Sequence, residues 1–229
     1  MAKAILVIGA SGTGKSTAWR NMPASKCCVI SPNSKPFPFK GAEQKFKVGT
    51  NLIICNELSD IPKLLKQAAD AGYKYILVED FTHFMTARIT STGFLNKNTG
   101  NEAFSKWNYF GADAGKAIQS VASLTQDDVY VVFNHHTETK DDGSVGMRTA
   151  GKLLDNVIDM PSYFTYIFHT IVTHKDGEAP LYQLMTNTDG KKLAKSPMGC
   201  FSKTLIDNDV KLIIDTITEY NNVPETVTK

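Results

Sequence analysis

Long apolar runs are missing from this chain of 229 residues. The apolar run nearest the N-terminus, Ala4 to Ile8, is too short for the core of a signal peptide. No later stretch approaches the ~18 consecutive apolar residues that a membrane span requires. We therefore expect a protein that stays in the cytoplasm where it is made and that has no membrane partner.

Cysteine is scarce and unpaired in the sequence. The four cysteines are Cys27, Cys28, Cys55 and Cys200. They form no C-x-x-C pair, and no histidine stands at the spacing of a zinc site. This pattern predicts reduced, packed thiols and no metal centre held by sulfur.

Low-complexity segments, internal repeats and Ser/Gly-rich linkers are also absent. Hydrophobic residues make up 42% of the chain and charged residues 21%, which is typical of an ordinary globular protein. The net charge is only +2, but residues 1–50 carry eight lysines and arginines against one acid, Glu43. An anionic partner is therefore expected at the N-terminal end.

Buried strands alternate with helical segments along the first part of the chain. Four apolar, β-rich runs predict strands buried on both faces: Ala4–Ile8, Cys27–Ile30, Tyr75–Val78 and Val129–Phe133. Helical periodicity lies between them, over about 60–72 and 102–124, where Ser59 or Asp60 can cap the first helix. This alternation predicts an α/β fold, a mostly parallel central sheet flanked by helices.

The C-terminal part has a different pattern. Residues 163–172 and 181–185 predict a β-hairpin extension, and residues 207–220 predict a closing helix. We expect one domain over residues 1–222 and a flexible C-terminal tail over 223–229.

A phosphate-binding motif follows the first strand directly. The sequence from Gly9 to Ser16 matches G-x-x-x-x-G-K-[ST], and it stands between a buried strand and a helix-compatible segment that ends near Pro23. In such a loop backbone N–H groups surround the β-phosphate, the lysine ammonium meets the β- and γ-phosphates, and the serine hydroxyl binds Mg²⁺. The sequence thus predicts that a nucleoside triphosphate with Mg²⁺ is bound by nine residues: Gly9, Ala10, Ser11, Gly12, Thr13, Gly14, Lys15, Ser16 and Thr17.

Polar residues follow two other predicted strands. Glu79 and Asp80 end the third strand, where an NTPase needs an acid to hold the metal through water. Alternation along a strand sends the two side chains in opposite directions, so one is expected at the metal and the other at the attacking water or a neighbouring loop. The sequence does not say which does which. Asn134 and His135 end the fourth strand and are expected to sense the γ-phosphate, although polar strand ends are common in α/β proteins.

The order of these motifs resembles the RecA-like recombinase core, and most closely the short phage RecA-like ATPases that act as single-strand DNA annealing proteins. The similar segments are GASGTGKST (9–17), KPFPFKG (35–41), ILVEDFTHFM (76–85) and VYVVFNHH (129–136). The resemblance implies a RecA-like P-loop NTPase domain that assembles as a homo-oligomer, a ring or a filament. It also implies an ATPase with catalytic residues Lys15, Glu79, Asp80, Asn134 and His135.

Two mobile loops face the DNA in this family. By position they correspond to residues 88–101 and 136–152, which implies phosphate contacts by Lys97, Arg148 and Lys152 and base stacking by Phe94. Basic residues on a late strand reach the γ-phosphate of the neighbouring subunit in recombinases of this type. The stretch that resembles it contains Lys191, Lys192 and Lys195.

The segment after the second strand departs from the family. A catalytic glutamate usually stands there, but Ser31 to Lys35 contains no carboxylate, so turnover is expected to be slow or to use Glu79. The basic, phenylalanine-containing run Lys35–Lys47 can either follow a nucleic-acid backbone or cover the edge of the sheet.

Three functions stay open at this point. The first is an oligomeric, Mg²⁺-dependent ATPase that binds single-stranded DNA in phage recombination, annealing or replication. The second is a small-molecule nucleoside or nucleotide kinase, which the scarcity of arginine disfavours because only Arg20, Arg88 and Arg148 occur. The third is a nucleotide-gated binding module without significant turnover.

Overall fold

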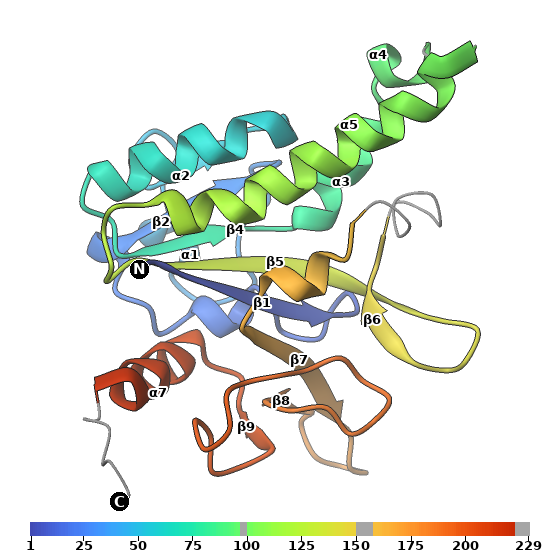
Figure 1. Cartoon of the computed structure of the whole chain (residues 1–229). Coiled ribbons are helices and arrows are strands. Elements are labelled where there is room, and N and C mark those ends of the chain that lie inside the picture. The colour runs from blue at the N-terminus through green and yellow to red at the C-terminus, as the bar shows by residue number, and fades with distance from the viewer. Residues whose placement is uncertain (97–99, 150–157, 223–229) are drawn as a thin grey trace, which may run out of the picture.

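The computed structural model describes residues 1–96, 100–149 and 158–222 (Figure 1). In this part of the chain a nine-stranded sheet has the order β3-β2-β4-β5-β1-β7-β8-β9, with β6 paired to β5. The strands are β1 (Lys3–Gly9), β2 (Cys27–Ser31), β3 (Leu52–Ile54), β4 (Tyr75–Val78), β5 (Tyr130–Thr139), β6 (Val145–Met147), β7 (Tyr166–Thr173), β8 (Leu181–Met185) and β9 (Leu205–Asp207).

Helices cover both faces of the sheet. In Figure 1, α2, α3 and α5 lie over one face, and α7 lies over the other. The helices are α1 (Ala42–Lys45), α2 (Ile61–Asp70), α3 (Phe81–Thr90), α4 (Thr92–Leu95), α5 (Gly100–Gln119) and α7 (Val210–Asn222). None of these described helices has the length and hydropathy needed to cross a bilayer.

The four predicted strands are confirmed, and they lie next to one another in the sheet. β1 pairs in parallel with β5 and β7, while β4 pairs in parallel with β2 and β5. Parallel strands bring their carboxyl ends to one edge, so the loops that follow β1, β2, β4 and β5 meet there. The predicted α/β fold is confirmed, and β7 and β8 form the expected antiparallel hairpin. The predicted tail, 223–229, lies outside the described residues.

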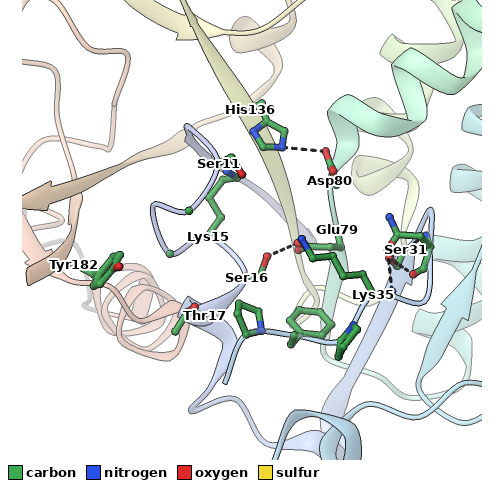
Figure 2. A pocket seen from close by; sticks show the side chains of 16 residues that line it. Ser11, Lys15, Ser16, Thr17, Ser31, Lys35, Glu79, Asp80, His136 and Tyr182 are labelled. Carbon is green, nitrogen blue, oxygen red and sulfur yellow. Dashed lines mark hydrogen bonds and ion pairs between the residues drawn. The ribbon is translucent and has the colours of Figure 1, made fainter. Parts of the chain in front are cut away.

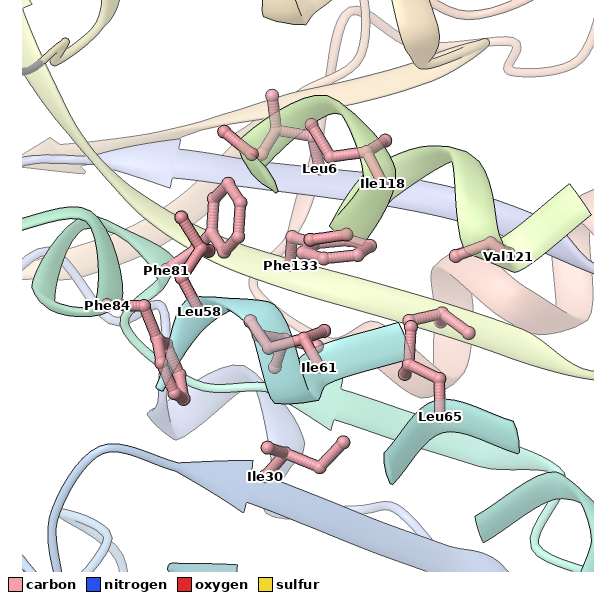
Figure 3. Packing of buried hydrophobic residues seen from close by; sticks show 14 of the residues in the cluster. Leu6, Ile30, Leu58, Ile61, Leu65, Phe81, Phe84, Ile118, Val121 and Phe133 are labelled. Atoms are coloured by element: carbon pink, nitrogen blue, oxygen red, sulfur yellow. The ribbon is translucent and has the colours of Figure 1, made fainter. Parts of the chain in front are cut away.

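Alternation along the buried strands divides the core into two layers. Leu6 and Ile8 of β1 join the cluster beneath α2, α3 and α5, whereas Ile5 and Val7 join the cluster against α7. Figure 3 shows the first of these layers, in which Phe133 of β5 packs among side chains of the covering helices. Both faces of the central strands are therefore apolar, as their uninterrupted sequence predicts.

Three local expectations were wrong. The segment after the phosphate-binding loop forms only a 3₁₀ turn, Thr17–Trp19, in place of a longer helix. Helix α2 is preceded by another 3₁₀ turn, so Asp60 has helical backbone angles and its side chain makes no capping hydrogen bond. Strand β5 does not end at Phe133 but continues to Thr139, because β1 pairs with residues 134–136 and β6 pairs with residues 137–139.

Replacing Phe133 by alanine tests the packing that holds β5 against the helices. The ring is fully buried and lies edge-to-face on Phe81 and Phe164, at centroid distances of 5.3 and 5.6 Å. We expect Phe133→Ala to lower the free energy of unfolding by about 3–5 kcal/mol in chemical denaturation. The control Tyr109→Ala, at a side chain 63% exposed on α5, should change it by no more than about 0.5 kcal/mol. Equal effects of the two variants would contradict this core assignment.

Candidate nucleotide-binding site

A cavity of about 550 Å³ lies at the carboxyl edge of the sheet. It is lined by the loops after β1, β2 and β4, by His136 of β5 and by Tyr182 of β8 (Figure 2). This size is typical of small-molecule sites. The cavity thus lies where the parallel strands were expected to bring their polar residues together.

The loop after β1 is shaped to present its backbone to an anion. Gly12 and Gly14 have φ angles of 78° and 97°, which residues with a side chain rarely adopt. The Lys15 ammonium is turned onto the loop and donates hydrogen bonds of 2.8 Å to the carbonyls of Gly9 and Ala10. Six of the nine predicted nucleotide-binding residues line the cavity: Ser11, Gly12, Gly14, Lys15, Ser16 and Thr17.

The other three predicted residues hold the shape of the loop. A Cβ atom on Gly9 would stand 1.7 Å from Thr170 Oγ1, so only glycine fits between the loop and β7. The hydroxyl of Thr13 donates to the Ala10 carbonyl at 2.8 Å and shares a 2.6 Å hydrogen bond with Thr170. Asn208 supports the far end of the loop, because its Nδ2 donates to the Gly14 carbonyl at 2.9 Å.

Thr170 and Asn208 were not predicted from the sequence. They are 157 and 194 residues away from their partners in the loop, and no motif surrounds them. Only the placement of β7 beside β1, and of the β9–α7 connection beside Gly14, shows what they do.

Glu79 is the acid that faces the phosphate-binding loop. The Ser16 hydroxyl donates to its Oε1, and Asn134 Nδ2 donates to its Oε2 at 2.7 Å. Burial raises the pKa of Glu79, although both hydrogen bonds oppose that shift. Of the two acids that the sequence could not tell apart, Glu79 is therefore the one in contact with the serine of the loop.

Asp80 points toward a different partner. It is the one non-glycine residue with positive φ, 52°, in the described part of the chain. Its Oδ1 accepts the backbone N–H of His83 at 3.2 Å, which caps α3, and lies 3.6 Å from His136 Nε2. Burial raises the pKa of Asp80, but His136 and the His83 N–H outweigh it and hold the pKa below its usual range.

The two predicted sensor residues have different positions. Asn134 is fully buried and contacts Glu79, as described above. His135 is also fully buried, its Nε2 lies 2.7 Å from the Arg148 carbonyl, and it does not line the cavity. The expectation that His135 reaches the γ-phosphate is corrected: alternation along the extended β5 turns it away, and His136 faces the cavity instead. Burial lowers the pKa of His135 to about 4, so it is neutral at physiological pH.

The oxygen atoms at the loop suit magnesium. Ser16 and Glu79 supply a hydroxyl and a carboxylate in direct contact, and Mg²⁺ prefers oxygen ligands, most of them from phosphates and water. In the described residues no group of three or more His, Cys, Asp or Glu side chains could hold a metal by itself. The donor set therefore fits a magnesium ion that arrives with a nucleotide.

Phe94 and Arg148, the two described residues among those assigned to DNA, do not line this cavity. Phe94 is 4% exposed and packs on Trp107 and Phe110, so its ring is not free to stack on a base in this arrangement. Arg148 is exposed after β6. Lys97 and Lys152 lie outside the described residues.

The three late lysines also lie away from the cavity. Lys191 is exposed, Lys192 forms an ion pair of 3.1 Å with Asp189, and Lys195 Nζ donates to the Pro161 carbonyl at 3.0 Å. Their expected role toward a neighbouring subunit stays a prediction.

Comparisons with known proteins identify a family. A family described as AAA domain, AAA_24, matches residues 1–197. No curated protein matches the sequence. The structure is similar to that of the Legionella pneumophila ATPase DotB, with a TM-score of 0.35 and 11% identity, over 82% of this chain and 46% of that chain. It is also similar to the pilus retraction motor PilT with bound ADP, with a TM-score of 0.39 and 12% identity, over 96% of this chain and 51% of that chain. The chain spans about half the length of each.

Glu79→Gln tests whether the site costs stability. Because folding raises the pKa of Glu79, the folded protein binds a proton there more tightly than the unfolded chain does. Below the ordinary glutamate pKa the side chain is protonated in both states and does not change the free energy of unfolding. As the pH rises above that pKa, ionisation favours the unfolded chain, so the residue destabilises the fold increasingly. We expect Glu79→Gln to raise the free energy of unfolding of the free protein by about 0.5–2 kcal/mol near pH 8 and by less near pH 5. A loss of stability at both pH values in urea titrations would contradict this.

Proposed function

The chain belongs to the AAA_24 family of AAA domains, and from this premise we propose that it binds ATP with magnesium in the cavity and hydrolyses it. One observation carries the proposal. The Ser16 hydroxyl of the phosphate-binding loop meets the Glu79 carboxylate at the end of β4, although 63 residues separate them in sequence. A serine and an acid in this relation are the metal-holding pair of a P-loop NTPase.

Each residue of the loop has a defined task in this proposal. The backbone N–H groups from Gly12 to Ser16 surround the β-phosphate. Lys15 is held over the loop by its two carbonyl contacts and supplies positive charge to the β- and γ-phosphates. Bound magnesium would neutralise phosphate charge, with the Ser16 hydroxyl as a direct ligand and Glu79 acting through water.

Hydrolysis would rely on the acids of β4. The loop after β2 supplies no carboxylate, and Asp80 is the second acid that lines the cavity. Asp80 is fixed by the N-terminus of α3 and by His136, so it can orient an attacking water molecule with little loss of side-chain freedom. Turnover is expected to be slow, since the usual glutamate is replaced.

The finer part of the proposal concerns single-stranded DNA and self-assembly. The match in motif order to the RecA-like annealing ATPases of phages supports it. One chain of contacts does as well: Asn134 touches Glu79, while the next residue, His135, holds the Arg148 carbonyl at 2.7 Å. A shift of β5 caused by the γ-phosphate would thus reach an exposed arginine.

The kinase alternative has less support. A small-molecule kinase holds two phosphorylated substrates, usually with several arginines, and none of the three arginines lines the cavity. Phosphoryl transfer to a nucleoside or nucleotide without DNA-stimulated hydrolysis would favour that alternative. Nucleotide binding without turnover would favour a gated binding module.

Lys15→Ala tests the nucleotide site. We expect this variant to lose at least about 100-fold in affinity for Mg-ATP in calorimetric titrations, because the phosphates lose their main fixed positive charge. The thermal unfolding temperature without nucleotide should stay close to that of the parent. The matched control Lys63→Ala, on the exposed side of α2, should bind normally. Unchanged ATP affinity in a folded Lys15→Ala protein would refute the site.

A salt titration tests the DNA role. We expect an oligonucleotide to bind more tightly with a non-hydrolysable ATP analogue than with ADP, and to stimulate hydrolysis. Arg148→Ala should lower the slope of log affinity against log salt by about one unit, because one phosphate contact is lost. Absence of binding at low salt, or equal affinity in both nucleotide states, would refute the DNA role and leave the ATPase assignment intact.

A further inference from the structure

The cavity extends past the phosphate-binding loop onto the segment that follows β2. Lys35 lines this part of the cavity together with Asn33 and Phe37. No function has been assigned to this wall. In the RecA-like family that the sequence resembles, a catalytic glutamate usually follows the second strand. Here the segment carries Lys35, whose charge is of the opposite sign.

Local interactions hold the segment in place. The Lys35 backbone N–H donates to Asn33 Oδ1 at 3.0 Å, and the lysine is followed by Pro36, whose ring restricts the backbone. Phe37 and Phe39 then pack on Phe46, with ring centroids 4.9 and 6.4 Å away. The sequence left open whether this basic run follows a nucleic-acid backbone or covers the edge of the sheet. The packing of the phenylalanines fits the second interpretation. The segment next to Lys35 is fixed before any ligand binds.

The Lys35 side chain extends into the cavity. Figure 2 shows it running from the loop after β2 toward the hydrogen bond between Ser16 and Glu79. Within the described residues its ammonium has no ion pair or hydrogen bond, in contrast to Lys15, which is held by two carbonyls. A lysine exposed to the cavity and not used by the protein is available to a ligand.

The position of Lys35 indicates which group of a bound nucleotide its ammonium would contact. In the proposed function the loop amides and Lys15 would surround one end of the phosphate chain, and Tyr182 lies on the side of the cavity beyond Thr17. Lys35 enters from the opposite side, next to Ser16 and Glu79, the residues that would hold magnesium. The group expected there is the last phosphate of a triphosphate, which ADP lacks.

We propose that Lys35 is a second phosphate-binding cation, which contacts the terminal phosphate of ATP from the side opposite Lys15 and makes the site prefer ATP over ADP. This inference rests on the proposed ATP binding and adds a residue to it. It also explains how one chain can neutralise the terminal phosphate where an acid would repel it. A lysine ammonium is a point charge that needs no bidentate geometry, so a flexible side chain on a fixed loop suffices.

The test compares two lysines of the same loop. Lys40 is exposed and does not line the cavity, so Lys40→Ala is the matched control for Lys35→Ala. Affinities for a β,γ-imido analogue of ATP and for ADP, each with Mg²⁺, are measured by calorimetry. We expect Lys35→Ala to lose about tenfold for the analogue and less than about twofold for ADP, since a charge-assisted contact to one phosphate is removed.

Two further variants complete the design. Lys35→Arg keeps the charge and should keep the preference for the analogue, whereas Lys35→Gln should lose it as Lys35→Ala does. Lys40→Ala should bind both nucleotides like the parent. Thermal unfolding without nucleotide verifies that each variant is folded.

The outcomes separate this inference from the proposed function. If the parent protein binds neither nucleotide, the proposed function fails. If the parent binds but Lys35→Ala retains full affinity for the analogue, or loses affinity equally for the analogue and ADP, only the role of Lys35 is overturned.

Discussion

The carboxylate of Glu79 joins three parts of the molecule. One oxygen accepts the Ser16 hydroxyl from the loop after β1, and the other accepts the Asn134 amide from β5, while Glu79 itself extends β4. A buried carboxylate is costly unless its lone pairs are satisfied, so these two donors have to stay in place. The phosphate-binding loop is therefore tied to the central strands.

The sheet order makes this arrangement possible. β5 lies between β1 and β4, and the register pairs Gly9 with His136 and Val78 with Phe133. The residues that follow these strands thus come to the same edge, where Ser16 and Asn134 contact the two oxygens of Glu79. The free protein holds Lys15, Glu79 and Asp80 close together at a partly desolvated site, and burial shifts the pKa of both Lys15 and Glu79 toward the neutral form. A bound nucleotide with its metal would offset the unfavourable desolvation of these charged groups. Functional sites commonly lower the stability of the free protein in this way.

The features predictable from the sequence are those that depend on neighbouring residues. Uninterrupted apolar runs predicted the four central strands, and the glycine-rich motif predicted the loop with its lysine and serine.

Other features depend on tertiary contacts and could not be predicted. The short strands β3, β6 and β9 have three residues each and carry no periodic signal. His135 and His136 could not be told apart, because which of them faces the cavity depends on β5 continuing as a strand through both residues, and their pairing with Ile8 and Gly9 of β1 decides that. Phe94 was assigned to base stacking by its place in a loop, but it packs on Trp107 and Phe110 of α5, a tertiary contact that its position in the sequence does not reveal. Thr170 and Asn208 reach the loop through tertiary contacts that no local pattern encodes.

Hydrogen exchange measured by mass spectrometry tests the central claim, that segments distant in sequence form one site for Mg-ATP. The protein is compared alone, with Mg²⁺ and with Mg²⁺ plus a non-hydrolysable ATP analogue. The account predicts that the analogue slows exchange in three separate segments: the loop after β1 at 10–17, the loop after β2 at 33–37, and the start of α3 at 80–83. Exchange in β9 and α7 away from Asn208 should not change. Protection confined to other regions, or no protection at saturating analogue, would contradict the account.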